Sequence, residues 1–340
     1  MSERILIVGA GAIGGVTAAH LTLAGHEVVV LEADPEHAAR LLEPGLRFEE
    51  LDAPEVVLPL DVVTSAEELP GSFDFALLTL KSLALPSALA HLTNGNHVDT
   101  YVSLGNGLIQ DVVRESVGKG SFLVGLVEWG ATNLGPGHLR QTTRAPFVIG
   151  EPDGTRSARV ERLCTILRDV APDTRVSTDI HSQVWSKLLI NSVFSGLGAL
   201  GGCLYRDIAE HPVSRELAFR IWTEGFDVAR QLGLELDEVW GFQPEELVVH
   251  RPQDRARAEA ALDTLMTKAG ATKASMLQDL ERGRRTEVDV INGGVVASAV
   301  AAGTKAPLNA ELTRLLHEFE DGIGAPGPVN FARLAEVTAS

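Results

Sequence analysis

The chain has 340 residues, 45% hydrophobic and 22% charged, a composition typical of an ordinary globular protein with a large core. Its length fits two domains. The formal net charge of −17 argues against nucleic acid or an anionic membrane as the main partner. Two cysteines, Cys164 and Cys203, are too few for a disulfide framework and lack metal-ligand spacing. We therefore expect inert thiols and no metal. The chain opens directly on a strand and contains no run of membrane-spanning length, so we expect a cytoplasmic protein.

The first 34 residues predict a strand, a glycine turn, a helix and a second strand. Ile5 to Val8 form a short apolar run, typical of a strand buried on both faces. In the turn that follows, Gly9 allows a sharp bend, Gly11 lets the backbone approach a pyrophosphate, and Gly14 lets the helix pack closely on the strand. We therefore predict a dinucleotide-binding turn built from Gly9, Gly11, Ala12, Ile13 and Gly14. The structural alternative is a glycine-rich turn that binds nothing.

An acidic residue follows the second strand at the position where a cofactor ribose would lie. Glu32 stands 23 residues after Gly9, where a carboxylate can accept hydrogen bonds from the adenosine ribose hydroxyls. A 2′-phosphate would meet like charge there, and no Arg or Lys lies between Glu32 and Arg40 to neutralise it. We therefore predict a preference for NAD(H) over NADP(H). The alternative is a solvated loop acid at the end of the strand.

Further strands alternate with helices through the first half of the chain. Strand-like segments span residues 56–63, 73–80, 100–104 and 121–128, which predicts a doubly wound α/β domain. Ligands in such sheets lie beyond the carboxyl ends of the strands. We therefore expect Lys81-Ser82 and Gly105-Asn106-Gly107 to line one crevice with the glycine turn.

The character of the sequence changes near Asp179. Residues 138–141 and 147–151 predict a β-hairpin, and residues 175–178 a last short strand. Helical periodicity then continues almost to the end of the chain. We therefore predict a dinucleotide-binding domain over residues 1–179 and an all-helical domain over 180–340. Within it, the charged stretch 245–268 is expected to be a solvated excursion.

One helix of the second domain carries polar residues in an apolar setting. Lys187, Asn191 and Ser195 are spaced four apart and should share one helix face, while the rest of the segment is apolar. Partial burial would lower the pKa of the lysine and suit it to donate a proton to a developing alkoxide. The alternative is a lysine whose stem is buried and whose ammonium reaches solvent.

A second polar stretch lies between residues 273 and 293. Thr286 could cap a helix, which would place Glu287 and Asp289 in the first turn, where the helix dipole favours anions. That is a complete structural explanation of both acids. Ser275, taken alone, is a surface serine.

Together these stretches resemble the ketopantoate reductase (2-dehydropantoate 2-reductase) family. The resemblance extends from residue 4 to about residue 320, and its C-terminal motifs are the most specific. The motifs are Gly9-Ala10-Gly11-Ala12-Ile13-Gly14, Thr79-Leu80-Lys81, Asn106-Gly107, Trp185-Ser186-Lys187-Leu188 with Asn191, Ser275-Met276-Leu277-Gln278-Asp279, and Thr286-Glu287-Val288-Asp289 with Ile291-Asn292-Gly293.

The resemblance implies a Rossmann domain, a helical domain and hydride transfer from a nicotinamide to a 2-oxo acid, giving a D-2-hydroxy acid. Lys187 matches the catalytic lysine that protonates the carbonyl oxygen, and Glu287 matches the acid that positions this lysine and binds a substrate hydroxyl. Four further residues match binding positions: Asn191 and Ser275 for substrate, and Lys81 and Asn106 beside the nicotinamide and the reacting centre.

The sequence departs from the family pattern at two positions. Ser195 stands where the family often has an asparagine that contacts substrate, and we expect it to bind substrate through its shorter hydroxyl. Glu32 stands where well-studied members have a basic residue after the second strand that favours NADPH. Ketopantoate remains the favoured substrate, but both departures point toward NAD-dependent D-2-hydroxyacid dehydrogenases for branched or aromatic 2-oxo acids. A non-catalytic NAD-binding sensor is the alternative of another class. A homodimer is a hypothesis by analogy alone.

Overall fold

The computed structural model describes residues 3–118 and 120–337, which divide into two compact units. Of the described residues, unit 1 comprises 3–105, 109–118 and 120–180, and unit 2 comprises 106–108 and 181–337. The short segment Asn106–Leu108 therefore packs with the second unit, although it follows a strand of the first.

Unit 1 is built on an eight-stranded sheet with the order β12-β11-β8-β7-β6-β1-β2-β5. The order β5-β2-β1-β6-β7-β8 within it is that of a doubly wound dinucleotide-binding fold, as expected. The pairs among these six strands are parallel, whereas β11 pairs antiparallel with β8. The strands are β1 (Arg4–Val8), β2 (Glu27–Leu31), β5 (Asp61–Val63), β6 (Phe73–Leu78), β7 (Val98–Ser103), β8 (Phe122–Val127), β11 (Phe147–Gly150) and β12 (Arg175–Val176).

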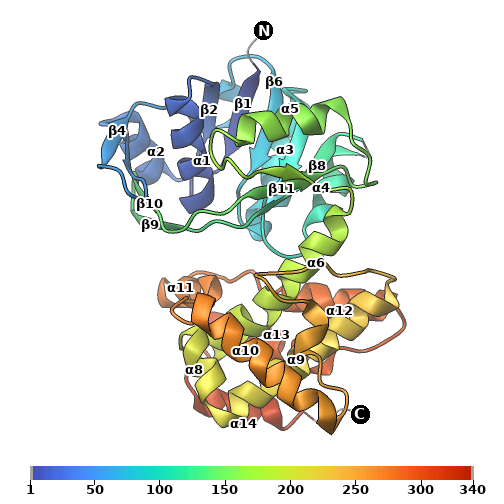
Figure 1. Ribbon diagram of the computed structural model, residues 1–340. Helices are drawn as coiled ribbons and strands as arrows, with labels where there is room; N and C mark the ends of the chain where they lie inside the picture. The colour runs from blue at the N-terminus through green and yellow to red at the C-terminus, as the bar shows by residue number, and fades with distance from the viewer. Residues whose placement is uncertain (1–2, 119, 338–340) are drawn as a thin grey trace. The chain divides into compact units, whose positions relative to one another are not determined.

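Helices cover this sheet because its strands are apolar on both sides (Figure 1). Ile7 and Leu77 of the central strands belong to one buried cluster with Val16 of α1 and Leu163 of α5. Leu6 and Leu78 alternate with these residues and so point to the other face. The helices of unit 1 are α1 (Ala12–Leu23), α2 (Pro35–Leu42), α3 (Leu85–Asn94), α4 (Gln110–Val117) and α5 (Ala158–Leu167), with short 3₁₀ turns at Ala66–Glu68 and Ser82–Ala84.

A second, four-stranded sheet overturns the predicted hairpin. Its order is β4-β3-β10-β9, with β3 (Leu46–Glu49), β4 (Val56–Leu58), β9 (Ala131–Gly135) and β10 (His138–Gln141). β10 pairs with β9 and β3, whereas β11 belongs to the large sheet. The connector cannot close a hairpin because its ends bond elsewhere: Thr142 N–H donates to Gly130 (2.8 Å), and Pro146 C=O accepts from Glu128 (3.1 Å). Residues 56–63 likewise form strands in different sheets, β4 and β5, which flank Pro59.

The described part of unit 2 is helical apart from short turns and bridges. Its helices are α6 (Ile180–Ile190), α7 (Gly196–Gly201), α8 (Tyr205–Glu210), α9 (Pro212–Gln231), α10 (Arg255–Ala269), α11 (Ser275–Glu281), α12 (Asn292–Ala301), α13 (Pro307–Glu320) and α14 (Val329–Ala335), with a π-helical turn at Asn191–Ser195 and 3₁₀ turns at Pro244–Leu247 and Pro252–Asp254.

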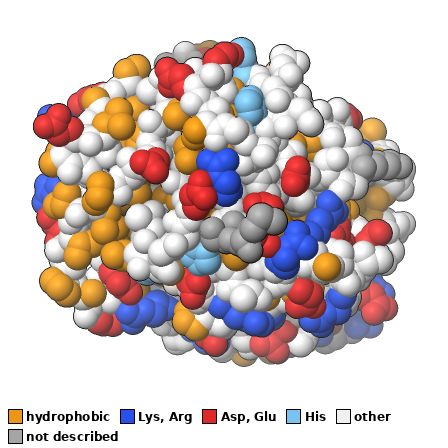
Figure 2. Space-filling view, turned by 90° about the horizontal axis from the view of Figure 1, so that it is seen from above, with side chains coloured by type: hydrophobic (Ala, Val, Ile, Leu, Met, Phe, Trp, Pro, Cys, Tyr) orange, Lys and Arg blue, Asp and Glu red, His pale blue; other side chains and the backbone are white. Residues whose placement is uncertain are grey.

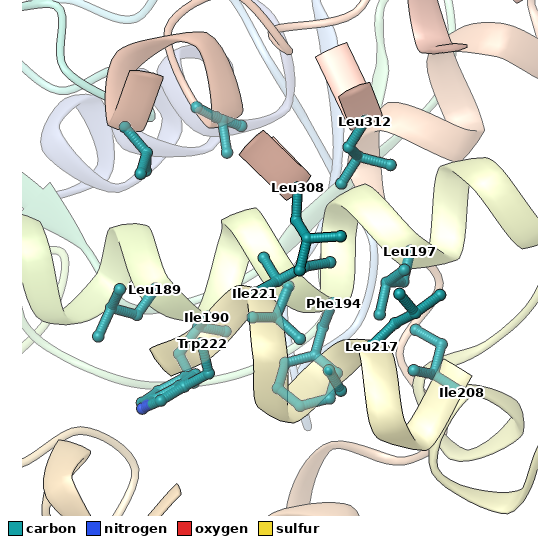
Figure 3. Close-up of a cluster of buried hydrophobic side chains, with 14 of the residues drawn as sticks. Leu189, Ile190, Phe194, Leu197, Ile208, Leu217, Ile221, Trp222, Leu308 and Leu312 are labelled. Carbon is teal, nitrogen blue, oxygen red and sulfur yellow. The ribbon is translucent and has the colours of Figure 1, made fainter. Parts of the chain in front are cut away.

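The central helical run of α6, the π turn and α7 lies in the core of unit 2. In Figure 3, Leu308 lies above this run and Trp222 below it, while Leu189 and Phe194 belong to the run itself. The expectation that residues 245–268 form a solvated excursion is wrong for α10. Leu262 and four other residues of this helix are buried in the core of unit 2.

No helix among the described residues is both long and apolar enough to cross a membrane. On the face shown in Figure 2, acidic and basic side chains are interspersed rather than gathered into a continuous patch of one sign.

A polar network anchors the segment around Thr286 to the end of α13. Oε1 of Glu320 accepts hydrogen bonds from the backbone N–H and the hydroxyl of Thr286, both at 2.7 Å. His317 lies 2.9 Å from both Glu320 Oε2 and Asp289 Oδ1. Burial works against the charged form of His317, but its hydrogen bonds to Glu320 and Asp289 outweigh burial and raise its pKa.

This network predicts a pH-dependent contribution of His317 to stability. Because the folded pKa is raised, the contribution should be complete below the unfolded value of about 6.5 and should disappear as pH rises through the folded pKa. Urea unfolding should be measured from below the unfolded pKa to above the folded pKa. The difference in free energy of unfolding between the wild type and His317→Asn should shrink with increasing pH. A difference that stays constant or grows would contradict the assignment.

Candidate functional site

The glycine turn joins β1 to α1 and leaves open space at the start of the helix. Gly9 has φ +91°, and a Cβ there would lie 2.6 Å from Leu80 Cδ2. A Cβ at Gly14 would lie 2.0 Å from Gly9 O, whereas a Cβ at Gly11 would meet nothing within 4 Å. Gly9 and Gly14 therefore permit the tight turn, and Gly11 leaves the backbone accessible in front of the N-terminus of α1. This arrangement fits a pyrophosphate group.

The end of β6 holds this turn through Thr79, to which the Thr79-Leu80-Lys81 motif gave no role of its own. Thr79 Oγ1 donates to Gly9 O (2.7 Å) and lies 3.0 Å from Val8 O. Lys81, which was singled out, is exposed and precedes the 3₁₀ turn at Ser82–Ala84. Because β1 and β6 are parallel neighbours, Thr79 reaches the glycine turn directly.

Glu32 lies against the glycine turn at the end of β2. Its Oε2 accepts a hydrogen bond from Ala10 N–H (2.8 Å), and its Oε1 accepts one from Asp34 N–H (2.9 Å). The two bonds fix the carboxylate beside the turn. A fixed negative charge therefore lies next to Ala10 of the glycine turn.

His37 also contacts the turn, and no sequence pattern points to it. The imidazole is buried, with Nε2 2.8 Å from Ala10 O and Nδ1 2.9 Å from Gly137 N. Because the Gly137 amide must donate, Nδ1 accepts, and Nε2–H donates to Ala10 O. Glu32 and His37 therefore hold the two sides of Ala10, its N–H and its C=O.

In unit 2, Lys187 and Asn191 are half-buried on consecutive turns of the central helical run. The neighbouring Ser186 hydroxyl donates to Asp237 O (2.9 Å), and the Gln183 amide donates to the Asp237 carboxylate. These bonds fix the rotation of α6 about its axis and thereby the direction in which Lys187 leaves the helix.

Ser195 is more deeply buried than Lys187 and Asn191, which are half-buried. Its side chain is buried, and its hydroxyl lies 3.1 Å from the hydroxyl of Tyr205. Residues Asn191–Ser195 form a π turn, so the backbone hydrogen-bond pattern of the helix changes here. Burial also raises the pKa of Tyr205, opposed in part by the Ser195 hydrogen bond.

Glu287 and Asn106 are brought together across 181 residues of sequence. Glu287 is only 6% exposed, and its Oε2 accepts from Asn106 Nδ2 at 3.3 Å. The backbone supports this contact, since Leu108 N–H donates to Val290 O (2.8 Å). A Cβ at Gly107, which has φ +74°, would lie 2.4 Å from the same carbonyl oxygen. The close approach therefore requires glycine.

The expected helical position of Glu287 and Asp289 is wrong. α12 begins only at Asn292, so both acids lie in turns before the helix. Thr286 caps one of these turns, because its hydroxyl accepts from Val288 N–H (3.2 Å). The helix dipole therefore does not explain the burial of Glu287.

Ser275 is exposed at the first position of α11. The preceding Ala274 is fully buried against α7, where a Cβ at Gly198 would lie 3.1 Å from Ala274 Cβ. The start of α11 is therefore fixed on the central helical run, while the serine hydroxyl faces solvent.

Family models match both parts of the chain. A model described as "Ketopantoate reductase PanE/ApbA" matches residues 5–154. A model described as "Ketopantoate reductase PanE/ApbA C terminal" matches residues 179–320. The 2-dehydropantoate 2-reductase of Mesorhizobium japonicum is 31% identical over 315 residues, which is 86% of this chain and 90% of that protein. The enzyme of the same name from Archaeoglobus fulgidus is 28% identical, covering 94% of this chain and 99% of its own.

Solved structures agree with this fold. A ternary structure of D-mandelate dehydrogenase with NADH and anilino(oxo)acetate matches with a TM-score of 0.81 and 24% identity, covering 94% of this chain and 99% of that one. With two family models over most of its length and relatives aligned nearly end to end, the chain belongs to the ketopantoate reductase family of oxidoreductases.

Proposed function

We propose that the protein reduces a 2-oxo acid to a D-2-hydroxy acid with NAD(P)H, and that 2-dehydropantoate, giving pantoate, is the favoured substrate. The observation that carries this proposal is the buried Glu287 carboxylate, which Asn106 approaches to 3.3 Å. Burying a carboxylate costs free energy, so a carboxylate that stays buried beside an amide indicates a functional role. The names of the relatives supply the substrate.

A proton donor and a positioning acid are both needed in this reaction. When bound, NAD(P)H would supply the hydride for reduction at C2 of the 2-oxo acid. The half-buried Lys187 ammonium gives a proton to the carbonyl oxygen as negative charge develops there. Glu287 orients Lys187 and accepts a hydrogen bond from a substrate hydroxyl. Asn191, Asn106 and the exposed Ser275 hydroxyl bind substrate, the last near its carboxylate.

The cofactor residues of the proposal are those of the glycine turn. Gly9, Gly11, Ala12, Ile13 and Gly14 bind the pyrophosphate, Glu32 binds the ribose hydroxyls, and Lys81 and Asn106 lie beside the nicotinamide. The Glu32 carboxylate, held by two backbone N–H groups, disfavours a 2′-phosphate and supports NADH.

A second candidate function is an NAD-dependent D-2-hydroxyacid dehydrogenase for branched or aromatic 2-oxo acids. The supporting observation is Ser195, whose hydroxyl pairs with buried Tyr205 and so leaves the substrate one polar contact fewer than the family pattern offers. A single such contact changes discrimination by roughly 1–3 kcal/mol. Steady-state assays with ketopantoate, 2-oxoisovalerate, 2-oxoisocaproate, phenylglyoxylate and pyruvate would rank the two candidates by kcat/KM.

We also propose a cellular location and an oligomeric state. We place the protein in the cytoplasm as a homodimer, with no nucleic-acid or membrane partner. Light scattering coupled to size-exclusion chromatography measures the mass of the assembly. A mass equal to one chain would contradict the dimer.

Removing the lysine should abolish turnover without preventing cofactor binding. Lys187→Ala should lower kcat by about 10²–10⁴-fold, the usual contribution of a general acid, and Glu287→Gln should lower kcat in the same direction. The dissociation constant for NADH, measured by fluorescence titration, should stay within about twofold. Lys305→Ala, at an exposed lysine of the same unit, is the control. If Lys187→Ala reduces 2-oxo acids at the wild-type rate, Lys187 is not the acid, and a non-catalytic sensor role regains support.

The charge of Glu32 should determine cofactor preference. Wild-type kcat/KM should be at least about tenfold higher with NADH than with NADPH. Glu32→Gln keeps an oxygen for Ala10 N–H but removes the charge, so the ratio should shift toward NADPH. Glu36→Gln, which neutralises an exposed acid on α2, should leave the ratio unchanged. A wild-type preference for NADPH would overturn the assignment of Glu32.

A further inference from the structure

The π turn at Asn191–Ser195 is held from outside the helix. A π turn interrupts the i→i−4 ladder of the α-helix, and such interruptions are stabilised where a side chain supplies a hydrogen bond. Here the Ser192 carbonyl oxygen accepts from Asn292 Nδ2 at 3.0 Å, across 100 residues of sequence. The turn that separates Asn191 from Ser195 therefore has its partner at the first residue of α12.

Asn292 belongs to a chain of buried polar groups. Its side chain is fully buried, and Nδ2 also donates to Asn309 Oδ1 at 2.9 Å. Asn309 Nδ2 in turn donates to Glu224 Oε1 (2.9 Å). Glu224 also accepts the backbone N–H groups of Leu308 and Asn309 at the start of α13. The chain runs from α9 through α13 and α12 to the π turn.

The packing around Asn292 makes room for this amide. A Cβ at Gly196, the residue after the π turn, would lie 2.5 Å from Leu312 Cδ2 and 3.3 Å from Asn292 Oδ1. Figure 3 shows Leu308 and Leu312 beside the helical run, and both belong to the apolar core of unit 2. Asn292 Oδ1 itself has no hydrogen-bond partner among the described residues. A buried amide that is only partly satisfied costs stability, so its retention calls for another reason.

We propose that Asn292 is a positioning residue for the reaction: by holding the Ser192 carbonyl it fixes the π turn and sets the orientation of Asn191 and Lys187. The same residue connects both halves of the site in unit 2. It ends the series of turns that begins at Glu287, in which Ile291 N–H donates to Glu287 O at 3.1 Å. Asn292 acts through these neighbours and does not itself touch substrate. Its effect on turnover rests on the proposed function, whereas its effect on the π turn does not.

Asn330 provides a matched control in the same unit. Its amide is also buried, at 4% exposure, and Nδ2 lies 3.3 Å from Leu200 O, 3.0 Å from Ala325 O and 2.9 Å from Gly327 O. It therefore ties a loop to α7, beyond the π turn. Asn330→Ala should destabilise the fold without changing the site.

The experiment compares Asn292→Ala with Asn330→Ala in the full chain. Both variants should lower Tm. Only Asn292→Ala should accelerate amide hydrogen exchange over residues 191–197, and only it should lower kcat/KM for the 2-oxo acid, by about 10–100-fold, as expected for a small displacement of catalytic groups. The NADH dissociation constant should stay within about twofold of the wild type. Asn309→Ala, which removes one support of Asn292, should change both readouts in the same direction but less, and it replaces Asn292→Ala if that variant does not fold.

The outcomes separate this inference from the proposed function. If the wild type reduces no 2-oxo acid, the proposed function fails, and the exchange data alone decide whether Asn292 holds the π turn. If the wild type is active and the Asn292 variant matches the Asn330 variant in both exchange and kcat/KM, the inference is overturned while the function stands. Faster exchange with unchanged kcat/KM would likewise reject a positioning role in the reaction.

Discussion

The site in unit 2 depends on one constraint, which is that the Glu287 carboxylate is buried and needs partners. Asn106 supplies one, and it can do so because Gly107 has no side chain to keep the two backbones apart. The segment Asn106–Leu108 is consequently part of unit 2 although the strand before it, β7, belongs to unit 1. This segment supplies the Asn106 amide to Glu287 and one backbone hydrogen bond, from Leu108 N–H to Val290 O.

At the carboxyl end of the large sheet, the glycine turn between β1 and α1 is stabilised by groups from outside the turn. Dinucleotide turns are open because they must present backbone N–H groups, and open turns have few internal contacts. In this protein, external groups supply those contacts. Thr79 holds Gly9 O, while Glu32 and His37 hold the N–H and C=O of Ala10. His37 adds a link to Gly137, so the small four-stranded sheet also supports the turn.

Local patterns were sufficient for part of this structure. The strand, turn and helix from Ile5 to Leu23 follow from short-range sequence alone, and the alternation of strands and helices predicted the doubly wound class of the domain. The sequence-based predictions were wrong where contacts between residues far apart in the chain determine the structure. Residues 138–151 do not form a hairpin because β10 and β11 find partners in different sheets. The π turn at Asn191–Ser195, whose Ser192 carbonyl is bonded to the distant Asn292, was likewise not predicted. His37 could not be found at all, since a histidine within an ordinary amphipathic helix carries no signal of its contacts.

The double contact of Glu32 has a consequence for how this family could exchange one cofactor for another. The carboxylate that would repel a 2′-phosphate is also the acceptor for Ala10 N–H. A substitution that deletes the carboxylate therefore leaves a backbone donor without its partner in the turn proposed to bind the pyrophosphate. Lineages moving between the two nicotinamide pools would need a second change that restores an acceptor there, or would have to pass through replacements that keep an oxygen at this position.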